Sequence, residues 1–587
     1  MASQARWKLN EIPEDAAKNL ARCCSLGVPA ARVLWGRGVH DEAAARQFLK
    51  PELRYLHDPF LMLGMDRAVD RLRRALTAHE PVMLYGDYDV DGISSVVLLL
   101  TMLRLMGHDA RFHVPDRLKD GYGMQCSVVD QAARDGIRLI VSLDTGIRAL
   151  EPIARARELG IDVIVTDHHL PEDGLPDAYA ILNPNQPGCQ YPNKGLCGAG
   201  VALKLIQALM ERENWPPHRI ATFSDSFLVM AAIATVADVV PLIGENRTIV
   251  KRGLERITRT TNAGLKALLN AGGVEPGSAI STSDIGFRVA PRINAAGRMD
   301  NASDVVELFM TQDEDRARAI ATRLDGLNIE RQKAGEDVVR DILEALRGQQ
   351  PTEDQAGLVF YDPSWHRGVV GIVASRVVEM YHRPALVLGR DDKTGYVQGS
   401  GRSIPSFHLL DALESIGDVF VRFGGHRQAV GITLEESRVD ELRQRFNAAA
   451  QKLLSKDDMQ PQLDIDAELR LEELNDASAA EILQLAPFGL ENPAPLFMVR
   501  NLELRQAPEV FGREGEHVRL RLYSGDVCQF AKAWRFAARA AEMEPGSRVD
   551  VVLTVDADSY GLKRGYAGWG VTVRDVRPAE ALTTLAK

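Results

Sequence analysis

LYGDYDVDGISSVVLLL, residues 84–100, is the stretch that decides the fold of this 587-residue chain. Its first residues form a short apolar run typical of a buried strand, and its last residues form an apolar helix. Between them, Asp87, Asp89 and Asp91 stand two residues apart, so an extended backbone presents their carboxylates on one face. Ligands bind beyond the carboxyl ends of strands in open α/β sheets. The stretch therefore predicts an α/β domain with an acidic site.

The same spacing fits the start of a calcium-binding EF-hand loop, DxDxDG. That loop needs a glutamate at its twelfth position, where this sequence has Leu98. An EF-hand is therefore excluded. A solvated acidic turn with only a structural role remains an alternative if this stretch is considered alone.

Two later stretches repeat the pattern of an apolar run that ends in an acid. LIVSLDTG places Asp144 at the end of the first run. DVIVTDHH places Asp167, His168 and His169 at the end of the second. A helix cap or a packed histidine would explain either stretch by itself. Because parallel strands end at one edge of their sheet, we expect these side chains to share a cleft with the first acidic stretch.

A fourth acid, Asp238, closes the apolar run FLVMAAIATVAD and needs a partner, because burying a lone carboxylate is costly. Carboxylates and imidazoles without a cysteine suit Mn²⁺ or Mg²⁺. In such sites one carboxylate bridges two ions about 3.5–4 Å apart, and the ions activate water for in-line attack on phosphorus. The residues therefore predict a two-metal phosphoesterase.

The rest of the chain alternates between helical and β-rich segments. Residues 1–75 are predicted to be helical, and 81–240 alternate Val- and Ile-rich runs with helices, as in a parallel sheet. Residues 314–347 contain no proline and predict a long polar helix between domains. Short strands and helices return at 355–454. Alternating runs after Pro461 predict a small antiparallel β domain, a barrel.

Composition is that of an ordinary globular protein, with 45% hydrophobic and 26% charged residues. No run reaches the ~18 apolar residues of a membrane span, and we see no secretory signal. The six cysteines have no disulfide or zinc spacing, so we expect a reduced, cytoplasmic protein. The net charge of −11 argues weakly against nucleic acid, but metal-binding carboxylates contribute to that sum.

The sequence resembles the DHH/DHHA1 phosphoesterase superfamily, and within it the RecJ family of exonucleases. DHH at 167–169 occurs together with DYDVDG, LDTG and ATVADVVPL. Further similar stretches follow in the order of that family: FLKPELRYLHDPFLMLGMD, VPDRLKDGYG, ILNPNQP, RINAAGRMD, HRGVVGIVASR, SGRS, GGHRQAVGIT and LAPFGLENPAPLF. The resemblance runs over almost the whole chain. Thr145 replaces the more usual Asn after Asp144 and leaves the carboxylate intact.

The resemblance implies an α/β multi-domain protein. We expect an N-terminal helical segment at 1–75, a parallel-sheet DHH phosphoesterase domain at 76–312 and a connecting helix at 313–350. An α/β DHHA1 domain is expected at 351–460, and an OB-like nucleic-acid-binding β-barrel at 461–587.

The resemblance also implies roles for individual residues. Two ions, Mn²⁺ or Mg²⁺, would be held by four carboxylates and one histidine: Asp89, Asp91, Asp144, His168 and Asp238. Asp144 would bridge the ions, and Asp87 is expected to be a further ligand or a neighbour of one. His169 would contact the scissile phosphate, and Asp167 would orient the histidine pair.

The resemblance implies contacts to DNA from a glycine-rich loop that includes a histidine, from a paired hydroxyl and guanidinium suited to a 5′-phosphate, and from three further arginines. Of these arginines, Arg117 would help to read the 5′ end, and Arg292 and Arg298 would follow the strand backbone. The predicted residues are Arg117, Arg292, Arg298, Ser400, Arg402, Gly424, Gly425 and His426. An ordinary tight turn remains the alternative for the two glycines, and a surface ion pair for Arg292 and Arg298.

The C-terminal segment places aromatic side chains among basic ones, which suits single-stranded DNA on an OB fold or, alternatively, the core of a small barrel. The aromatic residues are Tyr523, Phe530, Trp534 and Phe536, and the basic ones are Arg519, Arg521, Lys532 and Arg535.

The residues alone predict a two-metal hydrolase, and the resemblance narrows its function. It implies a single-stranded-DNA-specific 5′→3′ exonuclease that releases 5′-mononucleotides in DNA repair and recombination. It also implies a monomer without membrane attachment, with a single-strand-binding protein and a helicase as partners. One alternative is a DHH-family pyrophosphatase or an oligonucleotide or cyclic-dinucleotide phosphodiesterase, which would not need the C-terminal barrel. Another is a non-catalytic replication scaffold, which would lack the metal-binding carboxylates.

Overall fold

The structure is a computed structural model that describes residues 5–115, 123–172, 174–275, 277–299 and 301–579. Its contacts divide the chain into two compact units. The larger unit comprises Trp7–Ile293, Ala302–Arg318 and Asp464–Lys587, and the smaller unit centres on Ala319–Leu463 with Asn294–Asn301. Within the described part of the chain, no helix is long and apolar enough to cross a membrane.

The larger unit contains a five-stranded parallel sheet with the strand order β3-β2-β4-β5-β6. Its strands are β2 (Val82–Tyr85), β3 (Arg111–His113), β4 (Leu139–Leu143), β5 (Asp162–Thr166) and β6 (Ala180–Leu182). The central strands are apolar at nearly every position because helices cover both faces of the sheet. The predicted parallel α/β domain is thereby confirmed.

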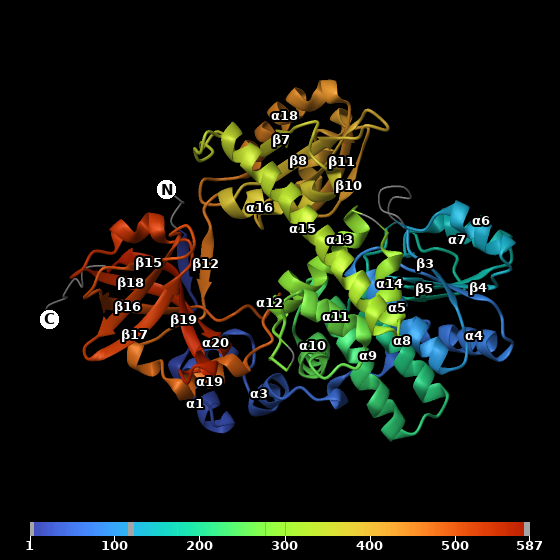
Figure 1. Ribbon diagram of the computed structural model, residues 1–587, viewed down its shortest axis with the longest axis horizontal. Coiled ribbons are helices and arrows are strands. Elements are labelled where there is room, and N and C mark those ends of the chain that lie inside the picture. The colour runs from blue at the N-terminus through green and yellow to red at the C-terminus, as the bar shows by residue number, and fades with distance from the viewer. Residues whose placement is uncertain (1–4, 116–122, 173, 276, 300, 580–587) are drawn as a thin grey trace. The chain divides into compact units, whose positions relative to one another are not determined.

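Two groups of helices cover this sheet (Figure 1). One face packs against α6 (Cys126–Arg134) and α7 (Leu150–Glu158). The helices α4 (Met65–Thr77), α5 (Val90–Leu105) and α8 (Gly198–Arg212) lie on the other face. These apolar contacts fix the strands, and with them the loops at their carboxyl ends.

The helices that follow the sheet belong mostly to the same unit. They are α9 (Pro217–Ala237), α10 (Gly244–Ile257), α11 (Ala263–Ala271), α12 (Thr282–Asp284), a π-helix at Ile285–Val289, α13 (Ala290–Met299) and α14 (Ser303–Met310). The apolar half of α9 is buried against α10, α5 and α8. Asp238, directly after α9, is thereby brought to the carboxyl edge of the sheet.

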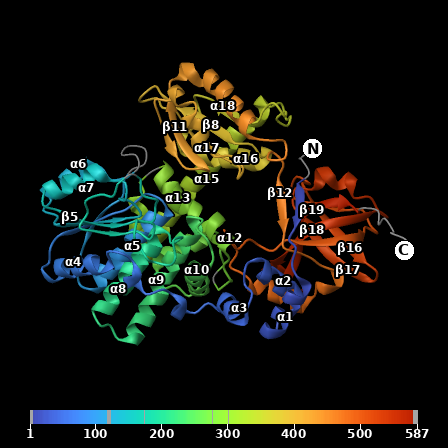
Figure 2. The same ribbon diagram turned by 180° about the vertical axis from the view of Figure 1, so that it is seen from behind.

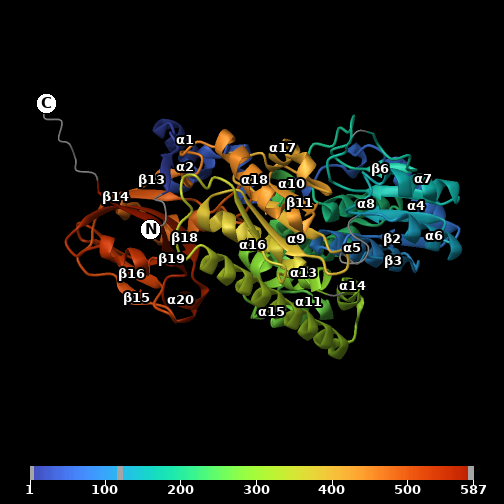
Figure 3. The ribbon, with the colours of Figure 1, turned by 90° about the horizontal axis from the view of Figure 1, so that it is seen from above.

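The long connecting helix predicted at 314–347 is α15 (Glu314–Ala345), a single helix of 32 residues (Figure 3). It ends two residues before the predicted limit, because Arg347 adopts a left-handed backbone with φ of 50° ahead of Gly348. The helix begins in the larger unit and continues into the smaller one.

The smaller unit is built on a mixed five-stranded sheet with the order β10-β11-β9-β8-β7. The strands are β7 (Leu358–Tyr361), β8 (Ala385–Arg390), β9 (Val397–Arg402), β10 (Arg422–Gly425) and β11 (Ala429–Leu434). One face packs against α16 (Arg367–Tyr381) and the last turns of α15. The other face packs against α17 (Leu409–Glu414) and α18 (Val439–Leu453), as Figure 2 shows.

The C-terminal part of the larger unit is a closed β-barrel. Its elements are β13 (Ala467–Glu468), α19 (Asp476–Gln484), β14 (Phe497–Glu503), β15 (Glu509–Phe511), β16 (His517–Ser524), β17 (Val527–Ala533), β18 (Arg548–Ala557), α20 (Ser559–Lys563) and β19 (Trp569–Pro578). The preceding strand, β12 (Gln462–Ile465), pairs with β1 (Arg6–Leu9) in a separate two-stranded sheet. The strands follow the order β14-β18-β19-β17-β16, and a pairing of Glu503 with Tyr523 joins β14 to β16. This pairing closes the predicted barrel. Two pairs, β13 with β14 and β17 with β19, are parallel, where the sequence had predicted only antiparallel strands.

The N-terminal helices share their hydrophobic core with this barrel. The first elements are β1 (Arg6–Leu9), α1 (Glu14–Cys24), α2 (Val28–Gly36) and α3 (Glu42–Leu49). Leu20 of α1 and Leu34 of α2 belong to the same buried cluster as Phe497 and Val518 of the barrel. The first helices and the last strands are therefore parts of one folded body.

Candidate metal centre

Three strands deliver acidic side chains to the carboxyl edge of the parallel sheet. Asp87 and Asp89 follow β2, Asp144 follows β4, and the DHH residues follow β5. Their ligand atoms form three overlapping groups, each within 4.8 Å: Asp87, Asp89 and Asp144; Asp144, His168 and His169; Asp91, His168 and Asp238. The structure thus brings together the six residues predicted to hold metal and the predicted phosphate-contacting His169.

The start of α5 fixes the first acidic loop. Asp89 is the N-cap of this helix, and its Oδ1 accepts hydrogen bonds from the backbone N–H groups of Asp91 and Gly92, both at 3.0 Å. A Cβ atom at Gly92 would lie 2.6 Å from the backbone nitrogen and oxygen of Asp87. Only glycine fits there, so the residue directly after Asp91 is constrained by its close approach to the Asp87 backbone.

Asp91 is held from the opposite side by the start of α8. Its two carboxylate oxygens accept hydrogen bonds from the N–H groups of Gly198 (2.6 Å) and Ala199 (2.7 Å). The positive end of a helix suits a buried carboxylate, and Asp91 is 2% exposed. A Cβ atom at Gly198 would come within 2.6–2.9 Å of the Asp144 side chain. Sequence reasoning missed Gly198, although the GAG at the start of an apolar helix could have indicated it.

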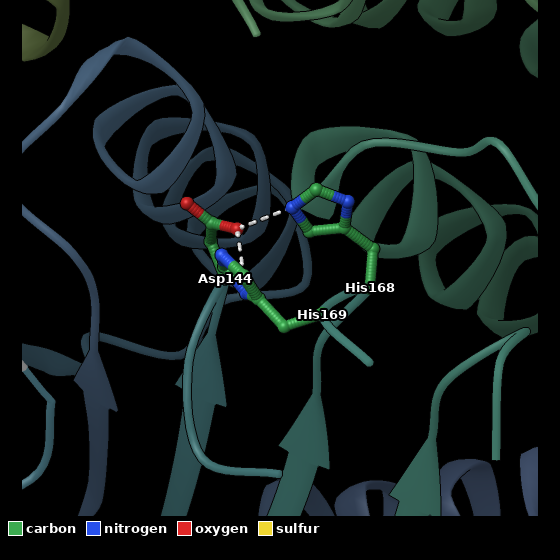
Figure 4. A group of neighbouring side chains, drawn as sticks. All are labelled: Asp144, His168 and His169. Atoms are coloured by element: carbon green, nitrogen blue, oxygen red, sulfur yellow. Dashed lines mark ion pairs between the residues drawn. The ribbon is translucent and has the colours of Figure 1, made fainter. Parts of the chain in front are cut away.

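Asp144 lies at the centre of the cluster. Its backbone is left-handed, with φ of 61°, a conformation that Asp tolerates better than most residues. Its Oδ1 lies 3.2 Å from Nε2 of His168 and 3.9 Å from Nδ1 of His169 (Figure 4). Although it is buried, this oxygen accepts no hydrogen bond from any residue that the structure describes. A buried acceptor without a donor is costly, and a bound cation would satisfy it.

Burial and mutual repulsion disfavour the ionised carboxylates in the absence of a cation. Burial, reinforced by the charge of Asp91, raises the pKa of Asp144 well above its ordinary value and that of Asp238 to about 9. The same two causes raise the pKa of Asp89. Burial lowers the pKa of His168, so this ring stays neutral and keeps a lone pair for a ligand bond. Oxygen donors with a neutral imidazole fit Mn²⁺ or Mg²⁺.

His169 has a different environment from His168. Its Nδ1 lies 2.7 Å from Oδ1 of Asp167, which is 1% exposed. Burial alone would lower the pKa of His169, but the hydrogen bond to Asp167 and the nearby carboxylates outweigh burial and raise it. Burial likewise opposes ionisation of Asp167, yet the same hydrogen bond leaves its pKa below the ordinary value. The hydrogen bond therefore favours protonation of the ring and ionisation of the carboxylate, which suits contact with a phosphate.

The smaller unit carries the predicted hydroxyl and guanidinium pair. Arg402 donates from Nη1 to Oγ of Ser400 (2.8 Å), and that hydroxyl donates to the carbonyl of Val430 (3.1 Å). A Cβ atom at Gly371 of α16 would lie 3.2 Å from the Ser400 hydroxyl, so the helix approaches this pair closely. The two side chains are therefore positioned together on β9.

Beside this pair, the sheet surface has a strip without side chains. Gly424 of β10 pairs with Gly431 of β11, which in turn pairs with Ser400 of β9. A Cβ atom at either glycine would meet nothing within 4 Å, so space above the strip is open. Gly425 has φ of 146° and no room for a Cβ atom, and His426 closes the turn by donating its N–H to the carbonyl of Ala429.

The three remaining predicted arginines have different positions. Arg292 of the larger unit donates to the carbonyls of Arg288 (2.5 Å) and Ala271 (3.1 Å). Arg298 of the smaller unit donates to the carbonyl of Gly368 (3.2 Å). Arg117 lies outside the described residues. The metal centre and the Ser400 pair belong to different units.

The outer face of β15, β16 and β17 combines aromatic rings with cations. Trp534 is 48% exposed, and its ring contacts those of His517 (4.7 Å) and Phe511 (5.7 Å), which also contact each other (5.2 Å). Phe530 is 62% exposed, and Arg521 stacks on it at 5.1 Å. In the same way, Arg519 stacks on Phe511 and Arg505 on Tyr523. Phe536, by contrast, packs against the core. The exposed Phe530 and Trp534 therefore suit the DNA-stacking interpretation, whereas Phe536 suits the alternative of a residue in the barrel core. All six cysteines are free.

Comparisons with known proteins cover both units. A model of the DHH family, N-terminal domain, matches residues 81–235, one of the DHHA1 domain matches 354–452, and one of the RecJ OB domain matches 465–566. The single-stranded-DNA-specific exonuclease RecJ of Bacillus subtilis (strain 168) is 38% identical over 94% of this chain and 68% of its own length.

Two crystal structures of RecJ from Thermus thermophilus have a similar fold. The complex with Mn²⁺ has a TM-score of 0.83 and 29% identity, and covers 99% of this chain and 80% of that one. The complex with Mg²⁺ has a TM-score of 0.76 and 28% identity, and covers 98% of this chain and 79% of that one.

Proposed function

The chain belongs to the RecJ family of single-stranded-DNA-specific exonucleases, and from this premise we propose that it hydrolyses single-stranded DNA from the 5′ end, releasing 5′-mononucleotides. It is a metal-dependent hydrolase. The observation that carries the proposal is the cluster around Asp144, whose buried Oδ1 has no donor among the described residues. A cluster that demands cations belongs to hydrolytic chemistry rather than to a scaffold.

The proposed site holds two ions, Mn²⁺ or Mg²⁺. The residues that would hold them are Asp87, Asp89, Asp91, Asp144, His168 and Asp238. When bound, the ions supply the positive charge that activates water and neutralises the phosphoryl oxygens. Asp144 would be the ligand shared by the two ions, because among the described residues it is the one carboxylate that belongs to two of the three ligand groups. His169 donates a hydrogen bond to the scissile phosphate, and Asp167 fixes the ring and its charge.

The proposed polarity depends on a binding site for the terminal phosphate. Ser400 and Arg402 present a hydroxyl and a guanidinium that are already joined to each other, a combination suited to a terminal phosphate. The strip of Gly424 and Gly431 leaves room for the strand next to that pair. We assign Arg117 to the 5′ end together with Ser400 and Arg402. Backbone contacts are assigned to the remaining predicted residues, which are Arg292, Arg298, Gly425 and His426.

Selection of single strands over small substrates is assigned to the barrel. Exposed Phe530 and Trp534 with their neighbouring cations form a surface on which unpaired bases stack regardless of sequence. A pyrophosphatase or dinucleotide phosphodiesterase would have no use for such a surface. An enzyme limited to unpaired strands also depends on proteins that open or coat DNA. We therefore propose a helicase and a single-strand-binding protein as partners of a monomer that acts in DNA repair and recombination in the cytoplasm.

The test uses the full chain with Mn²⁺ and one oligonucleotide labelled in turn at each end. With a 5′ label, we expect labelled mononucleotide from the first turnover, and with a 3′ label a ladder that shortens with time. Blunt duplex of the same sequence should remain intact, as should single strand mixed with the Asp144→Asn variant. A labelled mononucleotide released first from the 3′ end would refute the polarity. Turnover of pyrophosphate or dinucleotides only would refute the exonuclease assignment.

A further inference from the structure

The turn that carries the two histidines has three successive backbone carbonyls, and a side chain from another part of the chain holds each of them. Nδ2 of Asn185 donates to the carbonyl of His168 (2.7 Å), and Nδ2 of Asn183 donates to that of His169 (2.9 Å). The guanidinium of Arg148 donates twice to the carbonyl of Leu170, at 2.9 and 3.0 Å. No backbone carbonyl of this turn depends on solvent for its hydrogen bond.

The backbone N–H groups of the same turn are held from inside. Oδ1 of Asp167 accepts from the N–H groups of His168 (2.8 Å) and His169 (3.1 Å) as well as from the His169 ring. Its Oδ2 accepts from the N–H of Ile147 in the loop after β4 (2.9 Å). Strand β5 ends at Thr166, so hydrogen bonds from side chains, rather than strand pairing, hold the backbone of the turn that follows.

The two asparagines are themselves joined. They stand directly after β6 in the sequence Asn183-Pro184-Asn185, and the N–H of Asn185 donates to Oδ1 of Asn183 (2.7 Å). Asn183 is fully buried, and the intervening proline restricts the backbone further. Both amide groups are thus fixed before the histidine turn meets them.

We propose that Asn183 and Asn185 are positioning residues for the hydrolysis, Asn185 for the metal-binding ring of His168 and Asn183 for the phosphate-contacting ring of His169. This inference rests on the proposed function. A neutral amide supplies a donor without adding charge beside six carboxylates, which neither lysine nor aspartate could do. A catalytic side chain must be held to within about 0.5 Å, so its backbone has to be fixed as well as its ring.

The assignment makes the two asparagines separable by experiment. In Asn185→Ala, the loss falls on metal binding, so we expect Mn²⁺ affinity measured by calorimetry without DNA to fall about 10–100-fold. In Asn183→Ala, we expect kcat at saturating Mn²⁺ to fall by a similar factor, with KM for single-stranded DNA and Mn²⁺ affinity within about threefold of the parent values. The serine variants, which retain a donor, should recover part of each loss.

Asn193→Ala is the matched control. This asparagine lies eight residues from Asn185, donates to Oδ1 of Asn246 (3.0 Å) and accepts from the N–H of Gly195, and it contacts neither histidine. Its variant should keep parental Mn²⁺ affinity and kcat. If it loses both as strongly as the other two, the asparagines have only a general structural role, and the proposal is overturned.

The outcomes also separate this inference from the proposed function. Folded Asn183→Ala and Asn185→Ala proteins with parental kcat and Mn²⁺ affinity would overturn the positioning role and leave the exonuclease in place. If the parent protein binds Mn²⁺ but does not degrade DNA, the exonuclease assignment fails. The calorimetry of Asn185→Ala would even then decide whether the asparagine fixes His168. Circular dichroism and thermal melting identify any alanine variant that fails to fold. In that case, the corresponding serine variant is used to test the positioning role.

Discussion

The carboxyl edge of the parallel sheet and the outer face of the barrel are both suited to an anionic strand, yet they are built from opposite charges. At the sheet edge, buried carboxylates such as Asp91 and Asp144 need cations before they can approach a phosphate. At the barrel, exposed Arg519 and Arg521 lie against aromatic rings and need no ion. The net charge of −11 is a sum over the whole chain, so it reveals neither the acidic sheet edge nor the basic barrel face. Chemistry requires burial and fixed geometry, whereas capture of a strand tolerates exposure.

The largest expected effect tests the sheet edge. Asp144→Asn keeps the size of the side chain but removes the bridging charge, so kcat should fall about 10³-fold or more, because metal-ion catalysis supplies several kcal/mol. Steady-state kinetics with Mn²⁺ measures this. Anisotropy of a labelled single strand should change little, since the barrel is intact. Retention of a tenth of the parent activity would show that Asp144 is not the centre of the site.

The second effect tests the barrel face. Replacing both Phe530 and Trp534 by alanine should weaken binding of single-stranded DNA about 10–100-fold, because base stacking contributes ~1–3 kcal/mol per base. Fluorescence anisotropy measures the affinity, and calorimetry should show parental Mn²⁺ affinity. The control is Tyr566→Ala, an aromatic of similar exposure (72%) outside this face. Equal losses in the control would mean that the barrel binds through general hydrophobicity.

The third effect concerns pH. Between pH 7 and 9 the folded, metal-free chain retains a proton on Asp238, whose pKa is raised to about 9, whereas unfolded carboxyls are fully ionised. The raised pKa of Asp144 adds to this difference. The folded state therefore binds more protons, and its stability falls as pH rises through this window. The raised pKa of His169 acts in the same direction.

Thermal unfolding in chelator should accordingly show a Tm several degrees lower at pH 9 than at pH 7. Saturating Mn²⁺ should reduce the difference, because ion binding favours the ionised carboxylates. Asp238→Asn should also reduce it in the metal-free protein. A Tm that rises with pH in chelator would contradict the electrostatic description of the sheet edge.

The smallest effect sharpens the description of the barrel. Arg519→Gln should weaken DNA binding only a few-fold and reduce the slope of log affinity against log salt by about 0.7, the value for one phosphate contact on a single strand. Glu509, which pairs with Arg519 at 3.3 Å, provides the matched change. Glu509→Gln frees the guanidinium and should strengthen binding slightly. An unchanged salt slope in Arg519→Gln would show that this arginine does not contact a phosphate of the DNA.

The acidic edge could be predicted from sequence because each acid stands at or shortly after the end of an apolar run, so a local pattern marks it. The residues that hold the acids and histidines in place have no such mark. Gly198 donates to a carboxylate 107 positions earlier, and Asn185 to a carbonyl 17 positions earlier. Those bonds exist only after strands and helices have packed. For the same reason, the sequence did not predict that Leu34 and Phe497 share one hydrophobic core, because no periodicity in either segment could reveal it.

That shared core has a consequence for how the protein is made. Leu34 leaves the ribosome long before Phe497 is translated, and at about 5–20 residues per second the interval is tens of seconds. During that time the apolar faces of α1 and α2 have no native partner and are targets for chaperones. A nascent chain halted before the barrel would leave these apolar faces exposed to solvent, because the strands that cover the first helices are translated last.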